Sequence, residues 1–357
     1  MKRLNVLINI LRLQYLRYIF YKRDIKILPK EKLGILSKHE VRNIQEIWPI
    51  GRLRDFDLIY PKIFRYVYGY LPRFFMTDYQ LAQLYEHTNS IRKTEGLENK
   101  ALADVWFPSI PFPKVIMRQI NNVYYNANMS IVSEKEAIDN LYNSGMEHVV
   151  IKPSIDSNCG KGVFKLDLSK TSMQEVLERI RGYNGNFLVQ EVVESNKEIR
   201  QLCPSSINSC RITSIFLNGK FDYSACIKVG KKDSFLDNWR GSYFVGVDKN
   251  GVLSEFGLDN RINKTLRSDT GIPFKGFRIP CFHKMAQFVE LTHKRLFPHI
   301  GVVGWDILID SNYDVKVIEV NLSSPGVVGE QLASGTFFEP FWDDICEIIN
   351  KGKKSVN

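Results

Sequence analysis

Residues 301–321 read GVVGWDILIDSNYDVKVIEVN, and they predict an antiparallel hairpin with polar groups on one face. We expect the turn at residues 311–314, which places Asp306 of the first strand opposite Glu319 of the second. Asn321 follows Glu319 by two residues and therefore projects from the same face. Oxygen ligands that converge in this way suit Mg²⁺ held together with substrate phosphates. The alternative, a surface hairpin with incidental acids, fits poorly with the apolar residues around Asp306.

A second hairpin, SINSCRITSIFLNGKFDYSACIKVG, spans residues 206–230. A two-residue turn at Asn218-Gly219 requires positive φ and sets the register of the two strands. In that register Arg211 and Lys228 are diagonal neighbours on one face. Two cations at this spacing need an anion between them, and we expect a γ-phosphate or an acyl phosphate. The alternative is a pair of basic residues on a solvated sheet face.

A third segment, VVIKPSIDSNCGKGVFKLDL at residues 149–168, predicts a strand, a loop and a second strand. Lys152 lies near the end of the first strand, and the loop carries Gly160, Lys161 and Gly162. Glycines allow backbone N–H groups to approach phosphate oxygens, so such a loop can fold over a triphosphate. Its spacing fits neither GxxxxGK[ST] nor GxGxxG, so it supports neither a P-loop enzyme nor a Rossmann dehydrogenase. An ordinary solvated hairpin remains the alternative.

The chain has 357 residues and a net charge of +10, which favours anionic partners. Its six cysteines show no CxxC pair and its six histidines no metal-ligand spacing, so we expect reduced thiols in a cytoplasmic protein. Nine of the basic residues lie within residues 1–32, where apolar residues at steps of three and four predict an amphipathic helix. This helix either packs on the protein or lies on the anionic inner face of the cell membrane. It is interrupted by charges and is neither a signal peptide nor a membrane span.

The order of elements predicts an α+β protein with mainly antiparallel sheets. Residues 33–95 are rich in aromatics and read as helices and loops. Strand patterns dominate after residue 185, and a further hairpin is expected at Asn250-Gly251, again with positive φ.

Taken in order, Lys100, IKPSIDSNCGKG, FLVQEVV, SSINSCRIT, DNWRG, GWDILID and IEVNLSSPGVVGEQ resemble the ATP-grasp superfamily. The resemblance is greatest to its subgroup associated with sugar transfer and bacterial polysaccharide biosynthesis, and it covers about residues 33–345. It implies the ATP-grasp fold, in which two α+β subdomains clasp ATP. The implied division is a basic helix at 1–32, a helical region at 33–95, subdomain A at 96–188, catalytic subdomain B at 189–347 and a tail at 348–357.

The resemblance also implies roles for individual residues. The phosphates of ATP would contact Lys100, Lys152, Gly160, Lys161 and Gly162. The adenine hinge would be formed by Gln190, Glu191 and Val193, with Glu191 or Glu198 near the ribose. The metal ligands would be Asp306, Glu319 and Asn321, and the acyl-phosphate site would be formed by Asn208, Arg211 and Lys228. Two departures from the family pattern put the adenine and phosphate contacts in question. The hinge reads Gln190-Glu191 rather than beginning with Glu, and Lys228 stands where an arginine is expected.

These groups suit phosphoryl transfer from ATP to a carboxylate, followed by attack of an amine on the acyl phosphate. ATP and Mg²⁺ are the implied cofactors, and a sugar-linked acid or amine is an implied substrate in surface polysaccharide synthesis. One competing interpretation is an ATP-grasp kinase that phosphorylates a small molecule or sugar. Another is a nucleotide-binding regulator without turnover, and a third, nucleic-acid binding, lacks any recognisable motif.

Overall fold

The computed structural model describes residues 30–48, 55–90, 94–155, 160–232 and 240–354, together with residues 15, 19, 22, 234, 235 and 238. The expected helix within residues 1–32 falls almost wholly outside this set, as do residues 156–159 of the glycine-bearing loop. Among the described residues no helix is long and apolar enough to cross a membrane.

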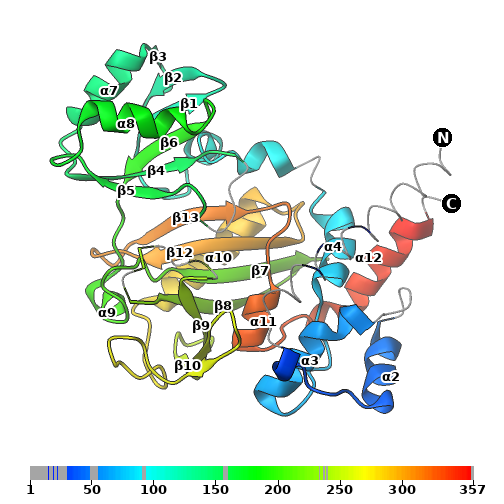
Figure 1. Cartoon of the computed structure of the whole chain (residues 1–357). Helices are drawn as coiled ribbons and strands as arrows, with labels where there is room; N and C mark the ends of the chain where they lie inside the picture. Colours follow the sequence, from blue (N-terminus) through cyan, green and yellow to red (C-terminus); the bar gives the residue numbers. More distant parts are fainter. Residues whose placement is uncertain are drawn as a thin grey trace.

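The described chain is a mixed α+β structure built on two antiparallel sheets, which confirms the expected fold class (Figure 1). The helical region before the first sheet contains η1 (Lys30–Lys32), α2 (Lys38–Ile47), η2 (Asp55–Leu58), α3 (Ile59–Tyr68), α4 (Asp78–Thr88), η3 (Glu95–Glu98) and α6 (Ala103–Trp106).

The first sheet has six strands in the order β3-β2-β1-β6-β4-β5 and lies at the top of Figure 1. Its part of the chain contains β1 (Val115–Ile120), β2 (Val123–Asn126), β3 (Ile131–Val132), α7 (Glu134–Tyr142), β4 (His148–Pro153), β5 (Phe164–Asp167), α8 (Met173–Arg181) and β6 (Phe187–Glu191). Ser133 and Ser172 begin α7 and α8 with complete capping boxes, which satisfy backbone donors at the helix starts. Apolar residues of these helices pack on one face of the sheet and leave the other face for Lys152.

The second sheet has seven strands in the order β11-β10-β9-β8-β7-β12-β13. Its part of the chain contains α9 (Lys197–Arg200), β7 (Cys210–Leu217), β8 (Lys220–Gly230), β9 (Ser242–Val247), β10 (Leu253–Leu258), β11 (Lys264–Thr265), α10 (Phe282–Leu296), β12 (Val302–Ile309), β13 (Val315–Asn321), α11 (Val328–Ser334), η4 (Glu339–Phe341) and α12 (Trp342–Lys354). Every residue of β12 is buried, because β12 lies between β7 and β13 and has packed elements on both faces.

Two packed layers cover this second sheet. Helix α10 lies behind it in Figure 1, and α11 lies in front. The front layer also includes α3, α4 and α12, whose apolar residues share one core with Ile215 and Leu217 of β7. The helical region that precedes the first sheet therefore packs against the last helices of the chain.

Of the two predicted turns, one is as expected and one differs in detail. Asn218 and Gly219 both have positive φ, and Leu217 pairs with Lys220 as the two-residue turn requires. At the β9–β10 hairpin only Gly251 has positive φ. There the Asp248 carboxylate accepts hydrogen bonds from the N–H groups of Asn250 and Val252, and this side-chain turn removes the need for an unusual Asn250 conformation.

The rear layer is joined to the sheet by a buried polar chain. The Ile300 carbonyl can only accept, so His293 Nε2 donates to it at 2.8 Å and His293 Nδ1 accepts from Ser214 Oγ at 2.7 Å. Ser214 Oγ in turn accepts from Trp305 Nε1 at 2.8 Å. Burial lowers the pKa of His293 to about 4, so the neutral imidazole is part of the folded core.

Acidification should therefore destabilise the protein through His293. An unfolded imidazole binds a proton near its ordinary pKa of 6.5, whereas the folded one resists until about pH 4. The contribution of neutral His293 to the free energy of unfolding is thus complete above about pH 6.5 and is lost as the pH falls. Between roughly pH 7 and pH 5 the free energy of unfolding should decrease by about 2 kcal/mol. Denaturant titrations should show this slope in the wild type and a smaller one in His293→Gln. The exposed His283→Gln variant of the same helix should keep the wild-type slope, and an equal slope in all three proteins would contradict the assignment.

Candidate active site

A row of ionised side chains crosses three neighbouring strands of the second sheet. Glu319 of β13 pairs in register with Asp306 of β12, and Asp306 pairs with Arg211 of β7. The predicted pairing of Asp306 with Glu319 is confirmed. Asn321 pairs with Gly304 two residues along, and its side-chain amide points to the Gly304 carbonyl at 3.5 Å. Three oxygen-bearing side chains therefore share one face of the hairpin.

Arg211 and Lys228 lie on the same face, as the sequence predicts, and Asp306 lies between them. Asp306 Oδ2 is 3.4 Å from Arg211 Nη1, and Asp306 Oδ1 accepts a hydrogen bond from Lys228 Nζ at 2.8 Å. Burial opposes the charge of Asp306, but Arg211 and Lys228 hold the pKa of its carboxyl below the ordinary value. The anion expected between the two cations is thus supplied here by the protein.

Two lysines approach from the opposite side, Lys152 on β4 of the first sheet and Lys100 in the segment between η3 and α6. Lys100 Nζ is 3.1 Å from Glu319 Oε1, and the Lys100 N–H donates to the Ser154 carbonyl just beyond β4. Lys152 is 9% exposed; burial and the charge of Lys100 lower its pKa to about 8 against the opposing effect of Glu319. Of the two phosphate lysines implied by the resemblance, Lys100 therefore contacts Glu319 directly, and Lys152 lies near enough for the charge of Glu319 to affect its pKa.

A residue absent from our sequence-based expectations completes this cluster. Glu330 of α11 is 2% exposed, and its Oε1 is 3.5 Å from Arg211 Nε. Burial opposes ionisation of Glu330 and raises the pKa of its carboxyl, while the charge of Arg211 favours the carboxylate form. The only signal in the sequence was an acidic residue in the apolar segment VVGEQLA, which follows the Pro325-Gly326 turn.

A second unanticipated pair positions Lys100. Arg118 of β1 is fully buried, and it binds both carboxylate oxygens of Asp104 at 2.7 and 2.8 Å. It also donates to the Ala101 carbonyl at 2.5 Å. Because this fork holds residues 101–104, it fixes the segment that carries Lys100.

The predicted hinge has its polar groups turned toward the segment that leads into β1. Gln190 Nε2 donates to the Pro113 carbonyl at 3.2 Å, and the Glu191 carboxylate accepts from the Lys114 N–H at 2.9 Å. Val193 follows in the extended segment after β6, half-buried. Of the two ribose candidates, Glu198 lies at α9, where Tyr313 donates to it at 3.3 Å.

Asn208 has a structural role in this geometry. It is fully buried with φ of 48°, its Nδ2 donates to the Cys203 carbonyl at 2.8 Å, and its Oδ1 accepts from the Gly230 N–H at 3.1 Å. Its amide is therefore used by the backbone at the ends of β7 and β8. It positions the strands that carry Arg211 and Lys228.

The glycine-bearing loop returns to β5 through a turn in which Gly160 and Gly162 both have positive φ. Tyr183 donates to the Gly162 carbonyl at 2.6 Å, and Lys161 is exposed. Beside the loop, a cavity of about 910 Å³ opens between β5 and the β8–β9 connection; its lining includes His148, Lys165 and Arg240. A volume of this size can hold a nucleotide or a substrate.

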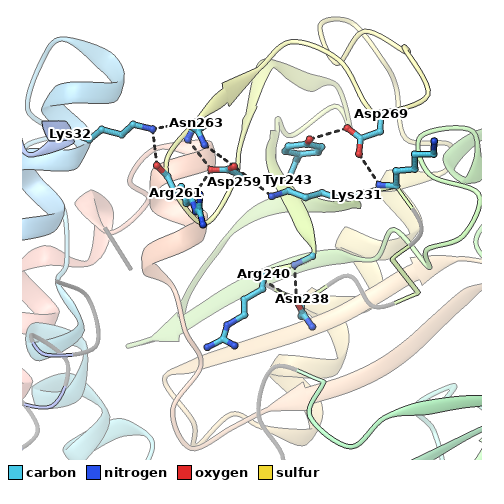
Figure 2. Close-up of polar contacts among 11 residues, drawn as sticks. Lys32, Lys231, Asn238, Arg240, Tyr243, Asp259, Arg261, Asn263 and Asp269 are labelled. Carbon is cyan, nitrogen blue, oxygen red and sulfur yellow. Dashed lines mark hydrogen bonds and ion pairs between the residues drawn. The ribbon is translucent and has the colours of Figure 1, made fainter. Parts of the chain in front are cut away.

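The β8–β9 connection, which carries the DNWRG motif, is anchored at its base. Asp269 accepts from the Lys232 N–H at 2.7 Å and from the Tyr243 hydroxyl at 2.9 Å. Asn238 Oδ1 accepts from the Arg240 N–H at 3.0 Å, and Figure 2 shows the Arg240 side chain extending away from this contact. A cationic side chain is thus presented from a fixed base at the edge of the cavity.

The donor set fits a magnesium ion. Asp306, Glu319 and Asn321 offer oxygens on one face, and the cationic residues that now pair with the two carboxylates are of the kind that bind phosphate. A group of potential ligands also occurs at Glu147, His148 and Asp167, but Asp167 is already bound by Lys170 and Ser169. Within the described residues, the row of side chains that crosses β13, β12 and β7 (Glu319, Asp306 and Arg211, called the strand row) is therefore the better metal-site candidate.

The chain is similar to one family of known proteins and to several solved structures. The family described as sugar-transfer associated ATP-grasp matches residues 79–346, and no curated protein matches. Similar solved structures include D-alanyl-alanine synthetase A from Vibrio cholerae, with 14% identity, a TM-score of 0.42 and coverage of 71% of this chain and 65% of that one. D-cycloserine synthetase DcsG has 13% identity, a TM-score of 0.41 and coverage of 75% of this chain and 72% of that one. Another is the biotin carboxylase domain of 2-oxoglutarate carboxylase from Hydrogenobacter thermophilus with MgADP, with 9% identity, a TM-score of 0.44 and coverage of 75% of this chain and 51% of that one.

This chain thus covers less than two thirds of two of these three structures. The family match is the stronger finding, because it extends over more than half of the chain and includes every residue of the strand row. The protein belongs to the sugar-transfer associated ATP-grasp family.

Proposed function

We propose that the protein uses ATP and Mg²⁺ to convert a carboxylate into an acyl phosphate, which an amine then attacks. The observation that carries this proposal is that four cationic side chains gather around the acids Asp306 and Glu319. Lys100 comes from the segment before the first sheet and Lys152 from that sheet, whereas Arg211 and Lys228 come from the second sheet. Four cations against the carboxylates of Asp306, Glu319 and Glu330 leave an excess of positive charge, which suits a triphosphate.

In this proposal each group has a defined task. Lys100 and Lys152 bind the phosphates of ATP, and the oxygens of Asp306, Glu319 and Asn321 hold the metal. When bound, Mg²⁺ neutralises charge on the transferred phosphoryl group and fixes its orientation. Arg211 and Lys228 are released from Asp306 and steady the carboxylate and then the acyl phosphate.

The chemical logic explains why ATP is required. A carboxylate cannot lose oxide, but after phosphorylation it can lose phosphate. The amine nitrogen forms a bond to the acyl carbon, the carbon–oxygen bond to phosphate breaks, and the nitrogen releases its extra protons. The chain need supply only charge and positioning for these steps.

The family description supports a sugar-linked acid or amine as a substrate, in the synthesis or modification of bacterial surface polysaccharide. We also propose that the protein acts in the cytoplasm beside the membrane, because nine basic residues lie within residues 1–32. Adenine would lie at residues 190–193 with Glu198 toward the ribose, and Gly160, Lys161 and Gly162 would cover the phosphates. The subdomain limits of 96–188 and 189–347 are part of the same proposal.

Nucleotide binding can be tested by calorimetric titration with ATP and Mg²⁺. The wild type should bind, and Lys152→Met and Glu319→Gln should each weaken affinity about tenfold or more, since each removes a charge within the site. Lys294→Met, an exposed lysine on α10, should bind as the wild type does. The proposal is wrong if the wild type does not bind ATP or if all four proteins bind it equally.

The acyl phosphate can be tested by trapping with hydroxylamine in the presence of ATP, Mg²⁺ and a panel of uronic and amino acids. The wild type should form a hydroxamate and ADP in equal amounts with at least one acid. Arg211→Lys should lower hydroxamate formation at least about tenfold while retaining ATP affinity, because a lysine cannot reproduce the guanidinium fork. The exposed Arg278→Lys variant is the matched control.

A stable phosphorylated product without hydroxamate would replace the ligase proposal with the kinase alternative. ATP binding without turnover on any acid, sugar or alcohol tested would favour a regulator.

A further inference from the structure

Arg211 is held between two carboxylates of different character. Asp306 lies on its Nη1 side, shares its charge with Lys228 and belongs to the candidate metal site. Glu330 lies on its Nε side, comes from α11 and is almost completely shielded from solvent. Together with Glu319 these acids raise the pKa of Arg211 against the opposing effect of burial. A buried guanidinium needs at least one such partner at all times.

The two carboxylates differ in what else they can do. Asp306 must turn an oxygen toward a metal ion if the proposed function is correct, which weakens its hold on Arg211. Glu330 is not among the candidate metal ligands: among the described residues its oxygens accept no hydrogen bond of strict geometry, although the nearby Thr213 hydroxyl favours its charge. Arg211 Nη1 likewise donates no such bond, so the fork can reorient around its Nε contact.

Helix α11 is a fixed support for Glu330. The neighbouring Gln331 joins it to Met76 by two hydrogen bonds, from the Met76 N–H at 2.9 Å and to the Met76 carbonyl at 2.8 Å. Ser334 donates to the Ala225 carbonyl of β8 at 2.6 Å, and Tyr85 of α4 donates to the Pro325 carbonyl at 2.8 Å. These hydrogen bonds hold the helix that carries Glu330, and the segment that leads into it, against neighbouring parts of the chain.

We propose that Glu330 is a positioning residue: it anchors Arg211 through Nε, so that Asp306 can leave the guanidinium for the metal without displacing it. This inference rests on the proposed function and adds a specific consequence. Without the anchor, Asp306 is the one remaining acid within ion-pair distance of Arg211 among the described residues. Arg211 then competes with the metal for Asp306, and metal affinity falls.

The test is a double-mutant cycle on Mg²⁺ affinity, measured by titrating Mg²⁺ into protein saturated with the non-hydrolysable analogue AMP-PNP. Glu330→Gln keeps the side-chain volume and removes the charge. It should weaken Mg²⁺ about fivefold, which corresponds to about 1 kcal/mol of coupling. In an Arg211→Met background the same change should alter the affinity less than about twofold, because no guanidinium is left to compete.

Glu330→Asp is the second variant, which protects the test against a fold defect in Glu330→Gln. It keeps the charge but is too short to reach Nε, so it should give an intermediate loss. Cys226→Ala is the matched control: Cys226 is the buried cross-strand partner of Arg211, and its replacement changes the same packed space without changing charge. Its Mg²⁺ affinity should match that of the wild type, even though loss of the buried sulfur lowers its thermal midpoint.

The outcomes separate the inference from the function on which it rests. An equal loss of Mg²⁺ affinity in the wild-type and Arg211→Met backgrounds would show that Glu330 acts through its general electrostatic field. No loss of Mg²⁺ affinity in either background would show that Glu330 has no effect on the metal. Each result overturns the positioning role and leaves the proposed nucleotide site standing. Failure of the wild type to bind AMP-PNP and Mg²⁺ would overturn the proposed function, and the inference with it.

Discussion

The ion pairs of Asp306 are the interaction on which the rest of the site depends. This carboxylate lies on β12, the strand that is buried along its whole length, and it binds Arg211 and Lys228 at once. A charge in that position is tolerated only with such partners. The strand order β8-β7-β12-β13 places Lys228 and Arg211 on one side of Asp306 and Glu319 on the other. The composition of the site therefore follows from the strand order of the second sheet.

The contacts between the sheets follow from the same charge balance. Glu319 is the partner of Lys100, which comes from the segment before the first sheet, and Lys152 lies close enough for both charges to shift its pKa. Arg118 and Asp104 fix the segment that carries Lys100, while α11 fixes Glu330 behind Arg211. These supporting residues thus set the positions of Lys100 and Arg211. Such supporting contacts keep catalytic geometry within the narrow limits that phosphoryl transfer needs.

Much of this arrangement could be predicted from local sequence patterns. The Asn218-Gly219 turn determined the diagonal placement of Arg211 and Lys228 on one face. The apolar runs of residues 301–321 determined the pairing of Asp306 with Glu319, because register follows from turn length and alternation. The insertion of β12 beside β7 is a long-range pairing without a local signal, so we expected a phosphate between Arg211 and Lys228 and the structure has Asp306 there. Glu330, Arg118 and the backbone role of Asn208 escaped prediction for the same reason: each depends on which segment packs beside it.

The central claim is that the row Glu319, Asp306 and Arg211 forms the metal and phosphate site, and crystallography with Mn²⁺ and AMP-PNP tests it most directly. Our account predicts an anomalous peak within bonding distance of Asp306, Glu319 and Asn321, with Lys100 and Lys152 on the phosphates of the analogue. A peak at Glu147, His148 and Asp167 instead, or an analogue bound away from both lysines, would contradict it.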